Sequence, residues 1–294
     1  MSMRFTEIGQ QLRAYRLESG LRAEEIAARL GVSRAALYRY EKGEVIKLDT
    51  IKRLAELLKI SPLSLLGIGV EYYNRPIGFF ERLRQVEETA DQILQVALPL
   101  AFLIASDELD AVETEIFREA TSEMGSDRAS TQAMADQVQG ILAERKRMYR
   151  MRRPAIIAML SSNSIARFLQ QGVGQGMVKS ESLRYRARVV ARNEIENIAN
   201  LMEAEPMGLQ FGLISSGDPT GQFQILRARD RATLAINSFR SDTIPHLQAG
   251  VAMITGADEA VAAHQRVAES MWRDSIKGVP ASYKLRELLT SNPL

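Results

Sequence analysis

The chain has 294 residues, of which 46% are hydrophobic and 25% charged, and its net charge is +2. It is too long for one small domain, so we expect at least two. It contains no cysteine, which excludes disulfides, thiolate metal sites and a cysteine nucleophile, and this composition suits a reducing compartment.

The most regular pattern lies at residues 23–43, which predict two short helices joined by a tight turn. Ile26 and Leu30 lie on one apolar face of the first helix. Gly31 follows, at a position where a left-handed residue ends a helix without steric cost. Ser33 can then cap the second helix, because its hydroxyl can accept a hydrogen bond from a first-turn N–H.

Further helices are predicted on both sides of this pair. One carries Ile8 and Leu12 on its apolar face and ends at Gly20. Two more cover residues 50–59 and 62–66, and the last begins at a proline, as helices often do. Together these segments form a five-helix unit.

Six residues of this unit stand at the offsets that typify one family of DNA-binding domains: Ala27, Gly31, Val32, Leu37, Glu41 and Gly43. Residues 1–68 resemble the lambda-repressor/Cro type of helix-turn-helix domain, also called the XRE family. The resemblance implies that residues 33–42 form a recognition helix in the major groove, with its N-terminal half over the base edges. It also implies a structural pair between Arg16 and Glu41. The alternative is a plain helical bundle.

Carried over by position, the recognition helix begins at Ser33 and turns Arg34, Ala35, Tyr38 and Arg39 toward the bases. An arginine there favours guanine through a bidentate bond to O6 and N7, and an alanine can meet a thymine methyl. The alternative for either arginine is that it is only solvated or bound to phosphate.

Two positions depart from the family pattern. Members usually begin the first helix of the pair with Thr or Ser followed by Gln, where this chain has Arg22 and Ala23. The usual cap is therefore lost, and we expect Arg22, Lys42 and Lys47 to contact phosphates. Such contacts supply affinity and its salt dependence rather than sequence preference.

The segments that follow differ in composition from the helix-turn-helix unit. Residues 69–80 form a junction rich in aromatic side chains, which we expect to dock on the protein's own second domain or on a partner subunit. We expect residues 81–153 to be a helical connector or dimerisation region. Within it, the apolar run from Ile93 to Ala105 is expected to be a buried helix, because it is too short to span a bilayer.

Charge is unevenly distributed along the middle of the chain. Residues 81–140 hold 13 acidic and 4 basic side chains, whereas residues 141–192 hold 12 basic and 2 acidic ones. One interpretation is that the two groups neutralise each other in a bundle or across a dimer interface. The other is that the basic residues at 145–153 form an anion-binding or additional DNA-contacting face.

Residues 154–294 mix short strands with helices. Strands are predicted near Phe211, Phe223, Ala232 and Val251, and a long helix from Asp258 to about Lys277. This mixture predicts an α/β or α+β domain for effector sensing or oligomerisation. It is similar to the phospholipase-D-like sensor domains fused to some bacterial regulators, although it lacks the catalytic His-x-Lys signature of that superfamily.

Four residues of this region are candidates for binding a carboxylate or phosphate: Ser215, Arg227, Arg229 and Arg240. Arg227 and Arg229 are two apart at a strand exit and so share a face, and arginines bind such anions through paired hydrogen bonds. The alternative is that nearby aspartates neutralise these arginines as surface pairs. The two histidines, His246 and His264, form no His-Glu-x-x-His motif, so we expect no metallopeptidase activity, metal or cofactor.

We therefore expect a mainly α protein with a five-helix DNA-binding domain at residues 1–68, a junction at 69–80, a middle helical segment at 81–153 and a mixed α/β domain at 154–294. Its expected function is sequence-specific transcriptional regulation, as a homodimer on a palindromic operator under the control of a small-molecule effector. The N-terminus carries no secretion signal pattern, so we expect a cytoplasmic, non-enzymatic protein that does not bind membranes. The alternatives are an enzyme, or an antitoxin-like module that binds another protein, with the helix-turn-helix used for autoregulation.

Overall fold

Five helices form the N-terminal domain of the computed structural model, which describes residues 5–98, 100–122, 128–174, 178–215, 221–239 and 250–294. They are α1 (Phe5–Ser19), α2 (Ala23–Leu30), α3 (Arg34–Glu41), α4 (Leu48–Leu58) and α5 (Pro62–Leu65). Gly31 adopts a left-handed φ of 71° at the end of α2, and the Ser33 hydroxyl accepts a hydrogen bond from the Ala36 N–H at the start of α3. The predicted five-helix unit is thus confirmed.

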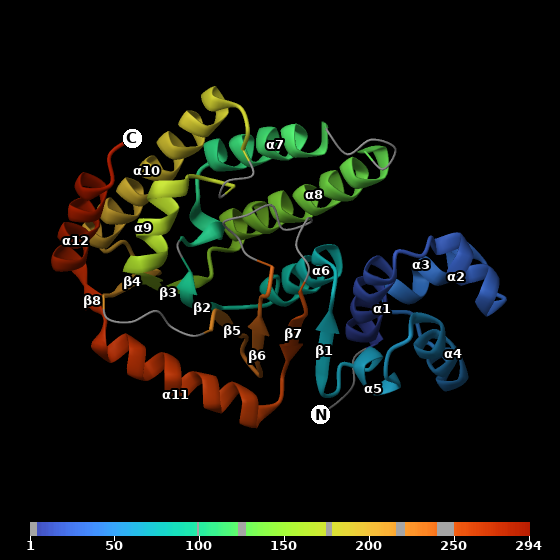
Figure 1. The fold of residues 1–294 in the computed structure, drawn as a ribbon. Helices are drawn as coiled ribbons and strands as arrows, with labels where there is room; N and C mark the ends of the chain where they lie inside the picture. Colours follow the sequence, from blue (N-terminus) through green and yellow to red (C-terminus); the bar gives the residue numbers. More distant parts are fainter. Residues whose placement is uncertain (1–4, 99, 123–127, 175–177, 216–220, 240–249) are drawn as a thin grey trace.

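An eight-stranded mixed sheet forms the centre of the remaining chain (Figure 1). Its strands are β1 (Val70–Tyr73), β2 (Gln92–Leu98), β3 (Ala155–Ser161), β4 (Leu209–Ile214), β5 (Phe223–Arg227), β6 (Ala232–Ile236), β7 (Ala252–Thr255) and β8 (Ile276–Lys277). They lie in the order β1-β7-β6-β5-β2-β3-β4-β8. The neighbours β2, β3 and β4 are parallel, and every other pairing is antiparallel. The four strands predicted after residue 210 are confirmed as β4 to β7.

Helices cover the two faces of the sheet unequally. One face packs into the large core with α6 (Pro76–Glu87), the short 3-10 helix η1 (Phe102–Ile104), α7 (Asp107–Ser122), α8 (Arg128–Arg152), α9 (Ser162–Gln171), α10 (Glu181–Ala204) and α12 (Gly278–Ser291). The other face packs on α11 (Asp258–Asp274), whose Ala268 lies against Phe223 and Leu234. Figure 1 shows α11 running below the sheet, apart from the other helices. A mainly α protein with a mixed α/β C-terminal part is therefore confirmed.

The apolar run from Ile93 to Ala105 is not the buried helix that the sequence predicted. It contains β2 and the single turn η1. β2 lies between β5 and β3, and the side chains from Ile93 to Ala97 are all buried. A strand covered on both faces shows no alternation of apolar and polar residues, so its periodicity does not distinguish it from a short buried helix. The segment 81–153 therefore contributes a central strand as well as helices.

The junction at residues 69–80 docks on the protein's own chain. β1 pairs with β7, and the ring of Tyr73 stacks on that of Tyr15 in α1, with centroids 5.3 Å apart. Beside this stack, Gln11 Nε2 donates a hydrogen bond of 2.6 Å to Glu71 Oε1. One continuous core includes α1, β1 and α6. The N-terminal domain is therefore held against the sheet by buried contacts.

The opposite charges of the middle segments neutralise each other, as one of the two interpretations predicted. The pairs are Arg145–Glu87, Lys146–Asp110, Arg147–Glu144, Arg150–Asp107 and Arg152–Asp91. Arg147 and Glu144 both lie on α8, whereas the other four pairs join α8 to α6, to α7 and to the residue before β2. Arg145 and Lys146 are buried, so these two basic residues serve packing. Within the described ranges, no helix has the length and apolar character that crossing a membrane requires.

Candidate nucleic-acid interface

α3 turns one face to the core and the other to solvent. Ala36, Leu37 and Glu41 are buried. Arg34, Ala35 and Arg39 are exposed. Figure 1 places α2 and α3 at one end of the molecule, away from the sheet. The exposed face of α3 is therefore accessible to a large partner.

Arg16 and Glu41 form the predicted structural pair. Arg16 Nε lies 2.5 Å from Glu41 Oε1, and its Nη2 donates to Oε2 at 3.2 Å. Both side chains are largely withdrawn from solvent, at 14% and 4% exposure. Because a bidentate pair of this kind fixes orientation as well as distance, it ties the end of α3 to α1.

The start of α2 is capped from within the helix. The Arg22 side chain makes no capping hydrogen bond, as expected, but its backbone N–H donates to Glu25 Oε2 at 2.9 Å. This is one half of a capping box. The chain thus replaces part of the lost cap and leaves the Arg22 guanidinium exposed.

Both candidate base-reading arginines are paired with nearby carboxylates. Arg34 Nη1 lies 2.7 Å from Glu24 Oε1, and Arg39 Nε lies 3.2 Å from Glu44 Oε2. All four side chains are more than half exposed. Exposed ion pairs contribute at most about 1 kcal/mol, so a nucleic acid can displace them.

Tyr38 occupies a different place from the other predicted base-facing residues. It is half-buried, and the centroid of its ring lies 5.3 Å from the guanidinium carbon of Arg34 and 5.9 Å from that of Arg16. Arg34 Nη2 also donates to its hydroxyl at 3.2 Å. Tyr38 therefore supports Arg34 as well as facing outward. The contact between Arg34 and Tyr38 could have been predicted from the sequence, because residues four apart on a helix are neighbours. The pair between Arg34 and Glu24 could not, because Glu24 lies on a different helix.

Three exposed cations surround α3. Arg22 precedes α2, Lys42 follows α3, and Lys47 precedes α4. They stand at helix ends, next to α2, α3 and α4. This placement suits contacts to phosphates on either side of a groove.

The structure does not bring together the predicted anion-binding residues. β4 runs parallel to β2, whereas β5 runs antiparallel to it. Ser215, which follows β4, therefore lies at the opposite end of the sheet from Arg227 and Arg229. Arg240 lies outside the described residues. The neighbouring Arg231 forms an ion pair of 2.7 Å with Glu7 of α1, so this arginine run contributes to the docking of the N-terminal domain.

Known proteins resemble this chain over its N-terminal part. Residues 7–65 match a protein family described as a helix-turn-helix domain. A solved structure entitled "Structure of TrmBL2, an archaeal chromatin protein, shows a novel mode of DNA binding" is similar at 12% identity, with a TM-score of 0.33, over 78% of this chain and 61% of that one. No curated protein matches. Residues 7–65 therefore form a helix-turn-helix domain, and together with the exposed face of α3 this supports a DNA-binding regulator.

Proposed function

We propose that this protein is a sequence-specific transcriptional regulator of the XRE type, which acts as a homodimer on a palindromic operator in the cytoplasm and catalyses no reaction. The observation that carries the proposal is the exposed polar face of α3, with Arg34 and Arg39 on it, in a domain of the helix-turn-helix family. Helices with this arrangement enter the major groove and read base edges with their N-terminal half.

In this docking, α3 lies in the major groove and its two arginines leave their carboxylate partners for guanine O6 and N7. Ala35 faces a thymine methyl group. Arg22, Lys42 and Lys47 neutralise phosphates, which adds affinity that falls as salt rises. Arg16 and Glu41 remain paired, because they are buried and hold α3 in place.

The rest of the chain sets the spacing of the two recognition helices in the dimer. Half-sites read by such dimers repeat at about 34 Å along the duplex. Because the helix-turn-helix domain shares one core with the sheet, the spacing depends on how two sheet domains associate. An effector bound by the C-terminal region would act on that association.

The proposal is tested by measuring operator binding of the full chain and of two single variants, Arg34→Ala and Arg39→Ala. The operator is first selected from random duplex DNA with the wild-type protein, and affinity is followed by fluorescence anisotropy. Each variant should bind about five- to 150-fold more weakly, since a bidentate arginine–guanine contact is worth about 1–3 kcal/mol. Arg266→Ala, an exposed arginine on α11, is the matched control and should bind normally. Unchanged binding by both α3 variants would refute the docking.

A further inference from the structure

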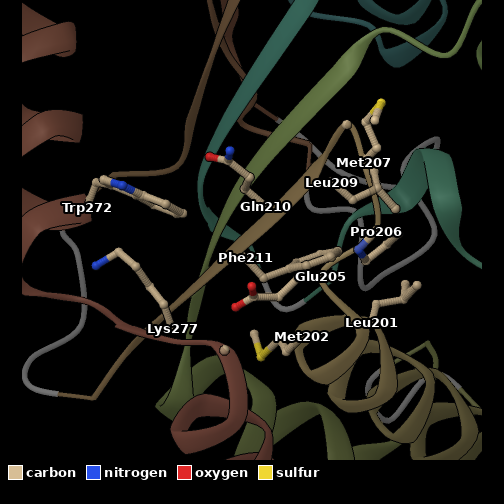
Figure 2. Close-up of a pocket in the computed structure, with 12 residues that line it drawn as sticks. Leu201, Met202, Glu205, Pro206, Met207, Leu209, Gln210, Phe211, Trp272 and Lys277 are labelled. Atoms are coloured by element: carbon tan, nitrogen blue, oxygen red, sulfur yellow. The ribbon is translucent and has the colours of Figure 1, made fainter.

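A cavity of about 480 Å³ lies at the β4–β8 edge of the sheet, the opposite edge from β1 and the helix-turn-helix domain (Figure 2). Its walls come from α10, β4, α11, β8 and the first residue of α12. Pockets that hold small molecules have volumes of roughly 300–1,000 Å³. The cavity is thus large enough for a small ligand, and none of the DNA-facing residues lines it.

Polar and apolar groups occupy different parts of the cavity. Figure 2 shows Trp272 and Lys277 together on one side, Pro206 and Met207 on the other, and the Glu205 carboxylate between them. The apolar wall is completed by Leu201, Met202, Leu209 and Phe211. A ligand that fills this space must therefore combine charged groups with an apolar body.

Uncharged groups orient Lys277, and it forms no ion pair with the residues that the structure describes. Its Nζ donates a hydrogen bond of 2.8 Å to the Ser275 carbonyl and lies 4.9 Å from the centroid of the Trp272 ring. Both contacts are to uncharged groups, and an ammonium group has three donors. Two of the three donors of Lys277 therefore stay available to an anionic group.

Glu205 is held in a strained conformation beside Lys277. It ends α10 with a left-handed φ of 43°, where glycine is the usual residue. Room for its carboxylate comes from Gly278, where a Cβ atom would stand 2.7 Å from Glu205 Oε1. Strain of this kind persists where the surrounding structure imposes it and gathers at functional sites. A glycine would end α10 with less strain but would place no carboxylate in the cavity.

The two charges line one cavity, yet the structure records no ion pair between them among the residues it describes. We propose that this cavity binds a small zwitterion with an apolar body, of the class of a free α-amino acid with a hydrophobic side chain. The ligand's ammonium group binds Glu205, its carboxylate binds Lys277, and its side chain lies against Pro206 and Met207. This inference rests on the proposed effector control and names the class of effector.

Trp272 makes the test direct, because it is the only tryptophan in the chain. Its intrinsic fluorescence is followed while the full-length protein is titrated with free leucine, methionine or valine. At least one of them should give a saturable change. The decarboxylated and deaminated analogues of that amino acid should bind about tenfold or more weakly, because each lacks one charge-assisted hydrogen bond.

Two variants locate the binding. Glu205→Gly removes the carboxylate and also relieves the left-handed backbone, so it should melt no lower than wild type yet bind the amino acid about tenfold or more weakly. Lys277→Met should weaken binding to a similar degree. Glu287→Gln and Lys284→Met alter an exposed ion pair on α12 outside the cavity, and both should bind as wild type does.

Three results would overturn the inference: no saturable change with any of the amino acids, equal binding of an analogue that lacks one charge, or unaltered binding by folded Glu205→Gly and Lys277→Met proteins. Operator binding by the ligand-free protein is measured separately. If the protein binds the amino acid but no operator, the DNA-binding proposal fails and this inference stands. If it binds an operator but no amino acid, this inference fails and the DNA-binding proposal stands.

Discussion

The buried ion pair between Glu87 and Arg145 should be one of the most sensitive points of the fold. Arg145 Nε and Nη2 donate to the two Glu87 oxygens, each at 2.8 Å, and the side chains are only 4% and 7% exposed. The guanidinium carbon also lies 5.4 Å from the centroid of Phe80 and 5.3 Å from that of Phe102. Glu87→Ala would leave this guanidinium buried with its charge partner removed.

The expected loss follows from that burial. Removing one partner of a buried pair costs about 3–5 kcal/mol. For a chain of this size each kcal/mol lowers Tm by roughly 2–4 °C, so the melting temperature should fall by about 10 °C. The double variant Glu87→Met with Arg145→Met should recover most of the loss, because apolar groups of similar volume often replace a buried pair without penalty.

Circular dichroism melting curves of wild type, Glu87→Ala and the double variant measure these effects. Glu144→Ala is the matched control, since it breaks the exposed pair with Arg147 on the same helix and should cost less than about 1 kcal/mol. The reasoning is refuted if Glu87→Ala has the same melting temperature as Glu144→Ala, or if the double variant melts no higher than Glu87→Ala.

Three further changes test other parts of the molecule. Burial raises the pKa of Glu18 to about 7, although the backbone N–H groups of Asn74 and Arg75 donate to its carboxylate. The folded protein thus holds this proton more tightly than the unfolded chain. The Tm of wild type should therefore fall relative to that of Glu18→Gln as pH rises from 4.5 to about 7. Parallel curves of Tm against pH for the two proteins would contradict this. Ser33→Ala removes the cap of α3 and should lower the free energy of unfolding by about 1 kcal/mol in denaturant titrations, and no change would argue against the cap. Tyr38→Leu should keep the fold but weaken operator binding roughly two- to fivefold, because it removes the ring that holds the Arg34 guanidinium. Tyr38→Phe keeps the ring and should retain most of the affinity. Equal binding by the two variants would show that the ring does not position Arg34.

The helix-turn-helix domain could be predicted from the sequence because its determinants are local. Gly31 and Ser33 act within a few residues of their own position, and the Arg16–Glu41 pair followed from the family resemblance. β2 could not be predicted in this way, because a strand buried on both faces lacks the alternation that identifies a strand. Ser215 and Arg227 lie far apart because β4 and β5 run in opposite directions. The spacing of residues in the sequence does not show the direction of a strand in the sheet.

The cavity at the β4–β8 edge was missed for a related reason. Glu205 ends a helix and Lys277 precedes another, and more than 70 residues separate them in the sequence. Only the pairing of β8 with β4 places them beside the same space. Neither residue belongs to a motif, so the signal for this site is the left-handed backbone at Glu205, which appears only in the structure.

The docking of the helix-turn-helix domain restricts how a ligand in this cavity can control DNA binding. Tyr15 stacks on Tyr73, and Gln11 bonds Glu71 in a buried contact, so swinging the domain away from the sheet would expose apolar and polar groups together. Moreover, the cavity lies at the other edge of the sheet. In the proposed dimer, such a ligand would therefore act on the association of two copies rather than on a hinge within one chain. A small rotation of one sheet domain against the other would carry each recognition helix with it, because the helix-turn-helix domain is packed on the sheet. The two recognition helices would then no longer match the roughly 34 Å repeat of half-sites.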